Sequence, residues 1–413
     1  MTETNQALAK ETEQRMIKQI ASELGIGAAQ VRTVASLLDD GNTIPFIARY
    51  RKEMTGELDE NQLRAIEERR SYLKGLEDRK VEVIRLIDEQ GKLTPELEAS
   101  IRKAVKLQEV EDLYRPYRQK RKTRASVAKE RGLEPLAEWL LAQPRSGDVP
   151  AEAAKYIDED KGVNSAEDAL QGAMDIIAEG VADDPDIRKW VRKFTWDQGI
   201  LISKAKNSEA ESVYEMYYQY SEPVKRLPPH RILAINRGER EDVLNVSIDV
   251  QADRIAAELH RRLIKGPSTA RDVLAAAAED AYKRLIAPSI ERELRGELTE
   301  RAEEHAISIF SENLRNLLLQ PPVKGRVVLG ADPAFRTGCK LAVVDETGKL
   351  MEVSVTYPTA PHHKTAEAEA TFRRLINQYG VELIVIGNGT ASRETEQFVV
   401  SVIHACRIRG FNI

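Results

Sequence analysis

The sequence has 413 residues, of which 31% are charged and only 5% aromatic, and its formal net charge is −5. This length is expected to give two or three domains, and this composition favours long amphipathic helices. The two cysteines form no Cys-x-x-Cys pair and no apolar run is long enough to cross a bilayer, which excludes a disulfide-stapled or membrane-spanning protein. We therefore expect a soluble protein of the reducing cytoplasm that needs no cofactor.

The first hundred or so residues have the pattern of packed helices. Apolar residues at helical spacing predict two helices over residues 12–38, with a break at Gly25-Ile26-Gly27. The spacing resembles a helix-turn-helix, but the packing of a helical hairpin explains it better than insertion into a DNA groove. The backbone is expected to be irregular at Ile44-Pro45. Another helix is predicted from Thr94-Pro95 to about residue 106, because a capping residue is followed by proline.

Residues 113–132, LYRPYRQKRKTRASVAKERG, form a basic segment between two predicted helices. The segment holds eight cations against the single acid Glu130, in a chain that is negative as a whole. Most charge runs are solvated faces, but Tyr114, Pro116 and Tyr117 interrupt this one, so it is not the polar stripe of a helix. Crowded cations repel one another, and a polyanion would relieve that repulsion and release counterions. The segment therefore predicts contact with a phosphate backbone.

Six of these cations are candidates for phosphate contact, and two tyrosines are candidates for stacking on bases. The candidates are Arg115, Arg118, Lys120, Arg121, Lys122 and Arg124, with Tyr114 and Tyr117 as the stacking partners. The secondary candidates are Arg49, Arg51 and Lys52. No metal-ligand spacing is found among the histidines, so no metal site is assigned.

Short amphipathic helices are predicted from residue 149 to residue 221. Trp190, Phe194 and Trp196 lie at roughly helical spacing and are interpreted as core residues rather than as a platform for bases. The alternation in ILAINRGEREDVLNVSIDV predicts a small strand pair around Arg237-Gly238. Helices are then expected from residue 252 to residue 319, ending before Pro321-Pro322.

The last ninety or so residues change in character. The stretches RVVLGADPAF, KLAVVDETGKLMEVSVTY and ELIVIGNG are β-branched runs, and residues 345–348 are predicted to form a hairpin turn. A helix is expected over about residues 365–379. The order of three strands, a helix and a parallel fourth strand is typical of the first half of a ribonuclease H-like fold.

Several stretches together resemble the Tex family of bacterial transcription accessory proteins, in order and from about residue 10 to about residue 400. These stretches are IPFIARYRKEMTGELDE, LYRPYRQKRKTRA with GLEPLAEWL, HRILAINRGERE, ENLRNLLLQPP and GADPAFRTGCKLAVVD. The resemblance implies a helical N-terminal part, a YqgF-type ribonuclease H-like domain and a role in binding nucleic acid. The helix-hairpin-helix and OB-fold modules of the family are not found in this sequence, so the chain is expected to be a fragment or a truncated product.

The expected fold class is mainly α: a multi-helical N-terminal scaffold followed by a partial α/β ribonuclease H-like (YqgF-type) domain. Three regions are expected: 1–225, helical with the helix-turn-helix-like start; 226–322, the small strand pair with linking helices; and 323–413, the incomplete YqgF domain.

Asp332 is the one residue of that domain that matches a catalytic position. It follows the first strand, where active ribonuclease H-like nucleases place a metal-binding carboxylate. The fourth strand ends in Gly387-Asn388-Gly389-Thr390, which offers no second acid, and one carboxylate cannot hold two metals. Asp332 is therefore interpreted as vestigial, or as part of a turn in which Arg336 pairs with it.

The favoured hypothesis is a non-catalytic, monomeric scaffold in transcription that binds RNA or DNA, with RNA polymerase as a further candidate partner. One alternative is a metal-dependent nuclease or junction resolvase that uses Asp332. The other is an interaction scaffold whose basic segment meets an acidic protein.

Overall fold

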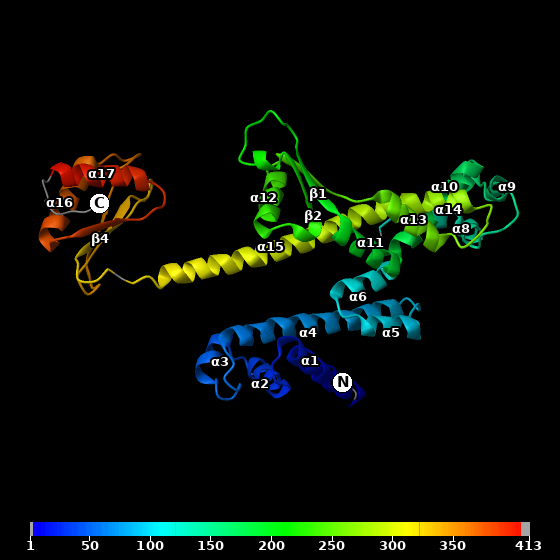
Figure 1. Ribbon diagram of the computed structural model, residues 1–413, viewed down its shortest axis with the longest axis horizontal. Helices are drawn as coiled ribbons and strands as arrows, with labels where there is room; N and C mark the ends of the chain where they lie inside the picture. The colour runs from blue at the N-terminus through cyan, green and yellow to red at the C-terminus, as the bar shows by residue number, and fades with distance from the viewer. Residues whose placement is uncertain (1–2, 120, 322, 406–413) are drawn as a thin grey trace. The chain divides into compact units, whose positions relative to one another are not determined.

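Helices make up most of the chain, as the composition predicts (Figure 1). The computed structural model describes residues 3–119, 121–321 and 323–405. The chain divides into two units, Met1–Ile307 and Ser308–Ile413. Among the described residues, no helix is both long enough and apolar enough to cross a membrane.

The first core of unit 1 lies among helices α1 to α6. These are α1 (Glu3–Leu24), α2 (Ala28–Asp39), α3 (Ile44–Tyr50), α4 (Glu60–Asp88), α5 (Pro95–Lys103) and α6 (Leu107–Tyr114). The long helix α4 packs against α1, α2 and α3 and buries Leu63 and Ile66 completely (Figure 1). The predicted break at Gly25-Ile26-Gly27 and the helix start at Thr94-Pro95 are both confirmed.

The prediction of an irregular backbone at Ile44-Pro45 was wrong, because both residues belong to α3. Proline in the first turn of a helix loses no hydrogen bond, since the N–H groups of that turn have no partner within the helix. Ile44 and Ile47, three residues apart, are buried in the first core, and their burial holds this short helix in place.

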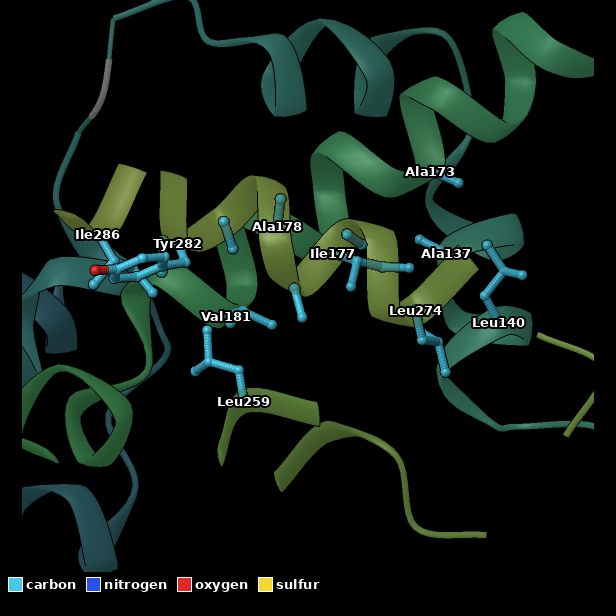
Figure 2. Close-up of a cluster of buried hydrophobic side chains, with 14 of the residues drawn as sticks. Ala137, Leu140, Ala173, Ile177, Ala178, Val181, Leu259, Leu274, Tyr282 and Ile286 are labelled. Carbon is cyan, nitrogen blue, oxygen red and sulfur yellow. The ribbon is translucent and has the colours of Figure 1, made fainter. Parts of the chain in front are cut away.

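The second core of unit 1 is centred on α10. It is built from α7 (Arg124–Glu130), α8 (Glu134–Leu141), α9 (Val149–Ala154), α10 (Ala166–Asp183), α11 (Pro185–Gln198), α13 (Ala252–Leu263), α14 (Arg271–Asp280), the π-helix η5 (Ala281–Ile286) and the first part of α15 (Ala287–Leu318). Figure 2 shows Ile177 and Ala178 of α10 close to Leu274 of α14. Short side chains let the helices approach closely: a Cβ at Gly172 would lie 2.3 Å from Leu133 Cδ1.

Three aromatic residues of this part of the chain pack against the second core: Trp190, Phe194 and Trp196. All three are partly buried, so the prediction that they are core residues is confirmed only in that they pack at the edge of the core. Two short 3-10 helices, η1 (Arg115–Tyr117) and η2 (Glu159–Lys161), connect the helices around this core.

A small antiparallel sheet interrupts the helices of unit 1. It has the strand order β2-β1-β3, formed by β1 (Ile200–Ala205), β2 (Gln219–Pro223) and β3 (Leu244–Asp249), with the 3-10 helices η3 (Glu215–Tyr217) and η4 (Val224–Arg226) on either side of β2. The predicted strand pair around Arg237-Gly238 was wrong, because helix α12 (Pro229–Arg240) occupies that position. Gly238 is not a turn residue but a packing residue, since a Cβ there would lie 2.6 Å from Leu244 Cδ1. Only β3, in the second half of the predicted pair, is a strand.

The second unit has the predicted order of three strands, a helix, a fourth strand and a further helix. These elements are β4 (Val328–Asp332), β5 (Cys339–Val344), β6 (Leu350–Thr356), α16 (Thr365–Tyr379), β7 (Leu383–Ile386) and α17 (Ser392–Ala405). The sheet order is β6-β5-β4-β7, with β7 parallel to β4. Leu329, Leu341 and Phe372 are fully buried between the sheet and its helices. The fold is thus mainly α with a partial α/β ribonuclease H-like domain.

Candidate nucleic-acid interface

The basic segment begins at an anchor on the first core of unit 1. Tyr114 at the end of α6 is only 8% exposed, and the guanidinium carbon of Arg79 lies 5.4 Å from the centre of its ring. In η1, Arg115 Nε donates to Asp183 Oδ1 over 3.1 Å, and Gln90 Nε2 donates to the carbonyl oxygen of Tyr117 over 2.9 Å. These contacts fix the chain just before the most basic residues.

The segment ends at a second anchor, helix α7. Thr123 caps this helix: its Oγ1 accepts from the backbone N–H of Ser126 over 3.0 Å, and Ser126 Oγ accepts from the Thr123 N–H over 2.8 Å. Such a reciprocal cap stabilises a helix start by about 1 kcal/mol. Ala125 and Ala128 are buried, and α7 packs against α10. The segment is therefore held on both sides by packed helices.

The cations between the two anchors face outward. Arg118, Arg121, Lys122 and Arg124 are exposed, and none of them forms an ion pair with any residue that the structure describes. Further along, Lys129 pairs with Glu134 over 2.8 Å. Lys120, the remaining predicted contact, lies outside the described residues. Arg124 interacts electrostatically with the buried Asp175 of α10. Exposed cations that form no ion pair, such as Arg118, Arg121 and Lys122, are available to a polyanion.

Two of the predicted site residues have a different role in the structure. Tyr114 cannot stack on a base because its ring is buried against the first core, so its assignment as a stacking partner is corrected to a packing role. Arg115 is half-buried and forms an ion pair with Asp183, so its role is to position the segment. Tyr117 packs against the same core but keeps part of its surface exposed.

An acidic groove lies beside the segment, with a volume of about 690 Å³. Pro116 and Lys129 line it, and the acids of its lining are Glu134, Glu138, Glu179, Asp183, Asp184 and Asp186. Lys129 and Arg262 are the cations of the lining, and two of the acids are already paired, Glu134 with Lys129 and Asp183 with Arg115. Acids still outnumber cations in the groove, which makes it a less favourable place for phosphates than the exposed side of the segment.

A cluster of buried charges holds α6, which leads into the basic segment. Arg188 of α11 is fully buried, and its guanidinium donates to Asp112 of α6 over 3.0 Å, to Ser289 over 3.2 Å and to Glu293 of α15. Arg192 lies next to it and donates to both acids, over 2.9 Å to Asp112 and 2.8 Å to Glu293. Although burial opposes the charge, hydrogen bonds from Arg192 to these carboxylates keep its pKa above the ordinary value. The two cations and two anions together tie α6 to α11 and α15.

A second exposed group of cations lies at the end of α3. Arg49, Arg51 and Lys52 are exposed and form no ion pair within the described part of the chain. Two aromatic rings accompany them, Phe46 and Tyr50, whose exposure sequence reasoning did not identify. Part of the signal was present, because Phe46 lies two residues after Ile44 and so faces away from the side of α3 that buries Ile44 and Ile47. Tyr50 lies three residues after Ile47, so its exposure could not be predicted from the spacing.

In the second unit, Asp332 is exposed at the end of β4, as predicted. The end of β7 lies next to it, since the Gly387 N–H donates to the Ala331 carbonyl oxygen over 2.8 Å and a Cβ at Gly387 would lie 3.3 Å from Asp332 Oδ1. Among the described residues Asp332 forms no ion pair with Arg336, and no three His, Cys, Asp or Glu side chains are grouped so that they could hold a metal ion. The structure thus places one carboxylate, that of Asp332, at this edge of the sheet, and among the described residues no second carboxylate is grouped with it to bind a metal.

Taken together, the helical scaffold and the sheet define a mainly α protein with a partial ribonuclease H-like domain. Sequence models of three Tex regions match it: the Tex-like protein N-terminal domain over residues 14–88, the Tex central region-like part over residues 145–310 and the Tex protein YqgF-like domain over residues 326–411. The chain belongs to the Tex family.

Relatives from distant organisms support this assignment. YdcI of Bacillus subtilis (strain 168) is 56% identical over 397 residues, which cover 95% of this chain and 55% of that protein. The transcriptional accessory protein Tex of Neisseria gonorrhoeae is 40% identical over 398 residues, covering 93% and 51%. The human S1 RNA-binding domain-containing protein 1 is 32% identical over 406 residues, covering 94% and 40%. The chain thus spans about half the length of the bacterial relatives.

Proposed function

We propose that this chain is a nucleic-acid-binding, non-catalytic scaffold that serves transcription, and that its basic segment contacts the phosphate backbone of RNA or DNA. The observation that carries the proposal is the outward exposure of Arg118, Arg121, Lys122 and Arg124, none of which forms an ion pair among the described residues. The names of two relatives, a transcriptional accessory protein and an S1 RNA-binding protein, support the same ligand class.

The proposal extends to the setting in which the chain acts. It works as a monomer in the cytoplasm, with RNA polymerase as a further partner. We assign the helix–glycine–helix start a packing role and not DNA binding, because Val31, Val34 and Leu37 of its second helix are buried in the first core.

A salt titration of binding tests the role of the basic segment. Four phosphate contacts give a slope of log K against log salt of about −3.6 for duplex DNA and about −2.8 for single strands. Replacing Arg121, Lys122 and Arg124 by alanine should reduce the magnitude of the slope by about two to three. The matched control replaces three exposed cations that already pair with an acid three or four residues away, Arg85, Arg102 and Lys155, and should leave the slope unchanged. A slope that the first triple variant does not alter would remove the basic segment from the interface.

A second candidate function rests on the position of Asp332 beside the end of β7. A nuclease or junction resolvase would cleave nucleic acid in the presence of magnesium or manganese, and Asp332→Ala would abolish that cleavage. The scaffold proposal expects binding without cleavage, and binding that Asp332→Ala does not change. If the chain binds neither DNA nor RNA, the interaction scaffold with an acidic protein partner replaces both.

A further inference from the structure

The segment from Phe46 to Thr55 reverses the usual distribution of polar and apolar side chains. Phe46 is 37% exposed, Tyr50 60% and Met54 58%, whereas the polar Thr55 is completely buried. Burying an aromatic side chain normally stabilises a fold by about 1.5–3 kcal/mol. The chain forgoes part of this stabilisation at Phe46 and Tyr50, whose rings lie next to each other in α3, and at Met54 in the turn that follows. We name this exposed group the aromatic platform (Phe46, Tyr50 and Met54).

Hydrogen bonds hold the turn that follows α3 and carries Met54. Thr55 Oγ1 donates to the Lys52 carbonyl oxygen over 2.9 Å, and Gln30 Nε2 of α2 donates to the carbonyl oxygens of Thr55 and Gly56, each over 3.1 Å. Gly56 adopts a φ of 68°, in the left-handed region, where a side chain would be strained. These contacts fix the turn after α3, so the platform keeps its shape without a ligand.

One of the three cations near the rings contacts a ring directly, and none of the three forms an ion pair within the described residues. The guanidinium carbon of Arg51 lies 5.2 Å from the centre of the Phe46 ring, and the rings of Phe46 and Tyr50 lie 5.2 Å apart at an angle of 47°. In the sequence, Arg49 precedes and Lys52 follows the Tyr50-Arg51 pair, and Glu53, directly after Lys52, is the nearest acid. The Arg51–Phe46 pair leaves the Tyr50 ring as the most exposed flat surface.

We propose that the aromatic platform stacks on unpaired bases of a single-stranded nucleic acid, with Arg49 and Lys52 contacting the flanking phosphates. Aromatic rings interleaved with cations are the surface that single strands require, because every base has a flat face and every linkage a negative charge. Tyr50 provides the main stacking surface, and the planar guanidinium of Arg51 provides a second one above Phe46.

The ligand is single-stranded because the bases of a duplex already stack on one another and offer the protein only their edges. The inference rests on the proposed function insofar as both assign nucleic acid as the ligand. The two surfaces act differently, however: the basic segment contributes phosphate contacts that weaken with salt, whereas stacking on the platform depends on the presence of bases.

Binding of the full chain to two single strands of about 12 nucleotides, one with bases and one abasic with the same phosphates, tests the platform. Stacking of one base contributes about 1–3 kcal/mol. With two stacking surfaces, Tyr50 and the Arg51 guanidinium, the wild-type chain should bind the strand with bases at least about tenfold more tightly than the abasic strand. The double variant Phe46→Ala, Tyr50→Ala should reduce this ratio towards one. The double variant Phe46→Leu, Tyr50→Leu keeps apolar surface but has no rings, and it should reduce the ratio equally.

The matched control is Tyr72→Ala. Tyr72 is also exposed and lies 4.8 Å from the guanidinium carbon of Arg69, but Glu23 neutralises that arginine through hydrogen bonds of 2.5 and 2.9 Å. This variant should keep the tenfold ratio. A wild-type ratio near one would overturn the proposal, and so would a leucine variant that keeps the wild-type ratio. If the double alanine variant loses only the binding of RNA polymerase, the proposal is also overturned, because the platform then belongs to a protein partner.

The outcomes also separate the two proposals. A ratio near one, together with a salt slope that still responds to the triple variant of the basic segment, rejects the platform alone. A tenfold ratio with a slope that does not respond rejects the basic segment alone.

Discussion

Replacing Arg188 by methionine should destabilise unit 1 strongly, because the arginine neutralises two carboxylates inside the fold. At 3.0 Å its attraction to Asp112 amounts to about 5 kcal/mol for an effective dielectric constant of about 20. Desolvation of the charges offsets most of this attraction while both partners are present. Removing one partner leaves an uncompensated buried charge, which costs about 3–5 kcal/mol.

The loss should be measurable as a lower midpoint of thermal unfolding. An unfolding entropy of about 2.1 cal/mol/K per residue, for a cooperative unit of about 300 residues, converts 3–5 kcal/mol into a decrease of about 5–8 °C. Arg85→Met, which removes an exposed cation paired with Glu89 on the same helix, should lower the midpoint by less than about 1 °C. Circular dichroism and differential scanning calorimetry would both report the change.

A second variant tests the cause of the loss. Arg188→Met combined with Asp112→Leu removes one cation and one anion and leaves Arg192 paired with Glu293 over 2.8 Å. The double variant should be more stable than Arg188→Met alone, because no buried carboxylate remains without a full partner. If the two substitutions instead add up, or if Arg188→Met lowers the midpoint by less than 2 °C, the cluster is not a coupled unit.

Two further outcomes concern the second unit. A hydrogen bond from Arg374 and a second from Tyr379 keep the pKa of Glu352 below its ordinary value of 4.5, so its stabilising effect is present above that pH and is lost as the pH falls through the lowered pKa. Glu352→Gln should therefore lower the unfolding midpoint at neutral pH, and this effect should disappear once the pH falls below the lowered pKa of Glu352; an effect that does not change with pH would contradict the ion pair. Burial raises the pKa of the Cys339 thiol to about 11. In a variant with Cys406→Ser, which leaves Cys339 as the only thiol, the native protein should therefore react with a disulfide reagent at about pH 8 far more slowly than the unfolded protein. Equal rates would show that the thiol is accessible.

The second unit could be predicted from the sequence because its signals are local. The β-branched runs alternate in register with the sheet, and the turn between β5 and β6 is set by one residue: Asp345 accepts hydrogen bonds from the backbone N–H groups of Thr347 and Lys349 over 2.8 and 2.9 Å. Information of this kind is contained within five consecutive residues. The strand order followed from the usual connections of such elements.

Helix α12 could not be predicted in the same way. Arg237-Gly238 has the composition of a turn. Gly238 is needed for another reason, because a Cβ at this position would clash with Leu244 and come close to Tyr214. A glycine that makes room for a neighbouring side chain and a glycine that forms a turn look alike in a sequence. Only the packing of α12 against β3 distinguishes them.

The candidate site shows the same limit for aromatic residues. Tyr114 and Tyr50 each precede an arginine and lie in a basic stretch, yet Tyr114 is 8% exposed and Tyr50 60%. The difference comes from partners far away in the sequence, such as Arg79 beside Tyr114. Arg188 was missed for this reason too, since its carboxylate partners lie 76 and 105 residues away.

The two anchors of the basic segment have a consequence for the strength of binding. Ordering the backbone of a disordered tail on a ligand costs about 1–2 kcal/mol per residue, and at η1 and α7 this ordering is complete as soon as the chain folds. The segment is thus held at both ends, which lowers the conformational entropy that it would lose if it bound a polyanion. A free peptide with the sequence of residues 113–132 would carry the same charge but bind more weakly.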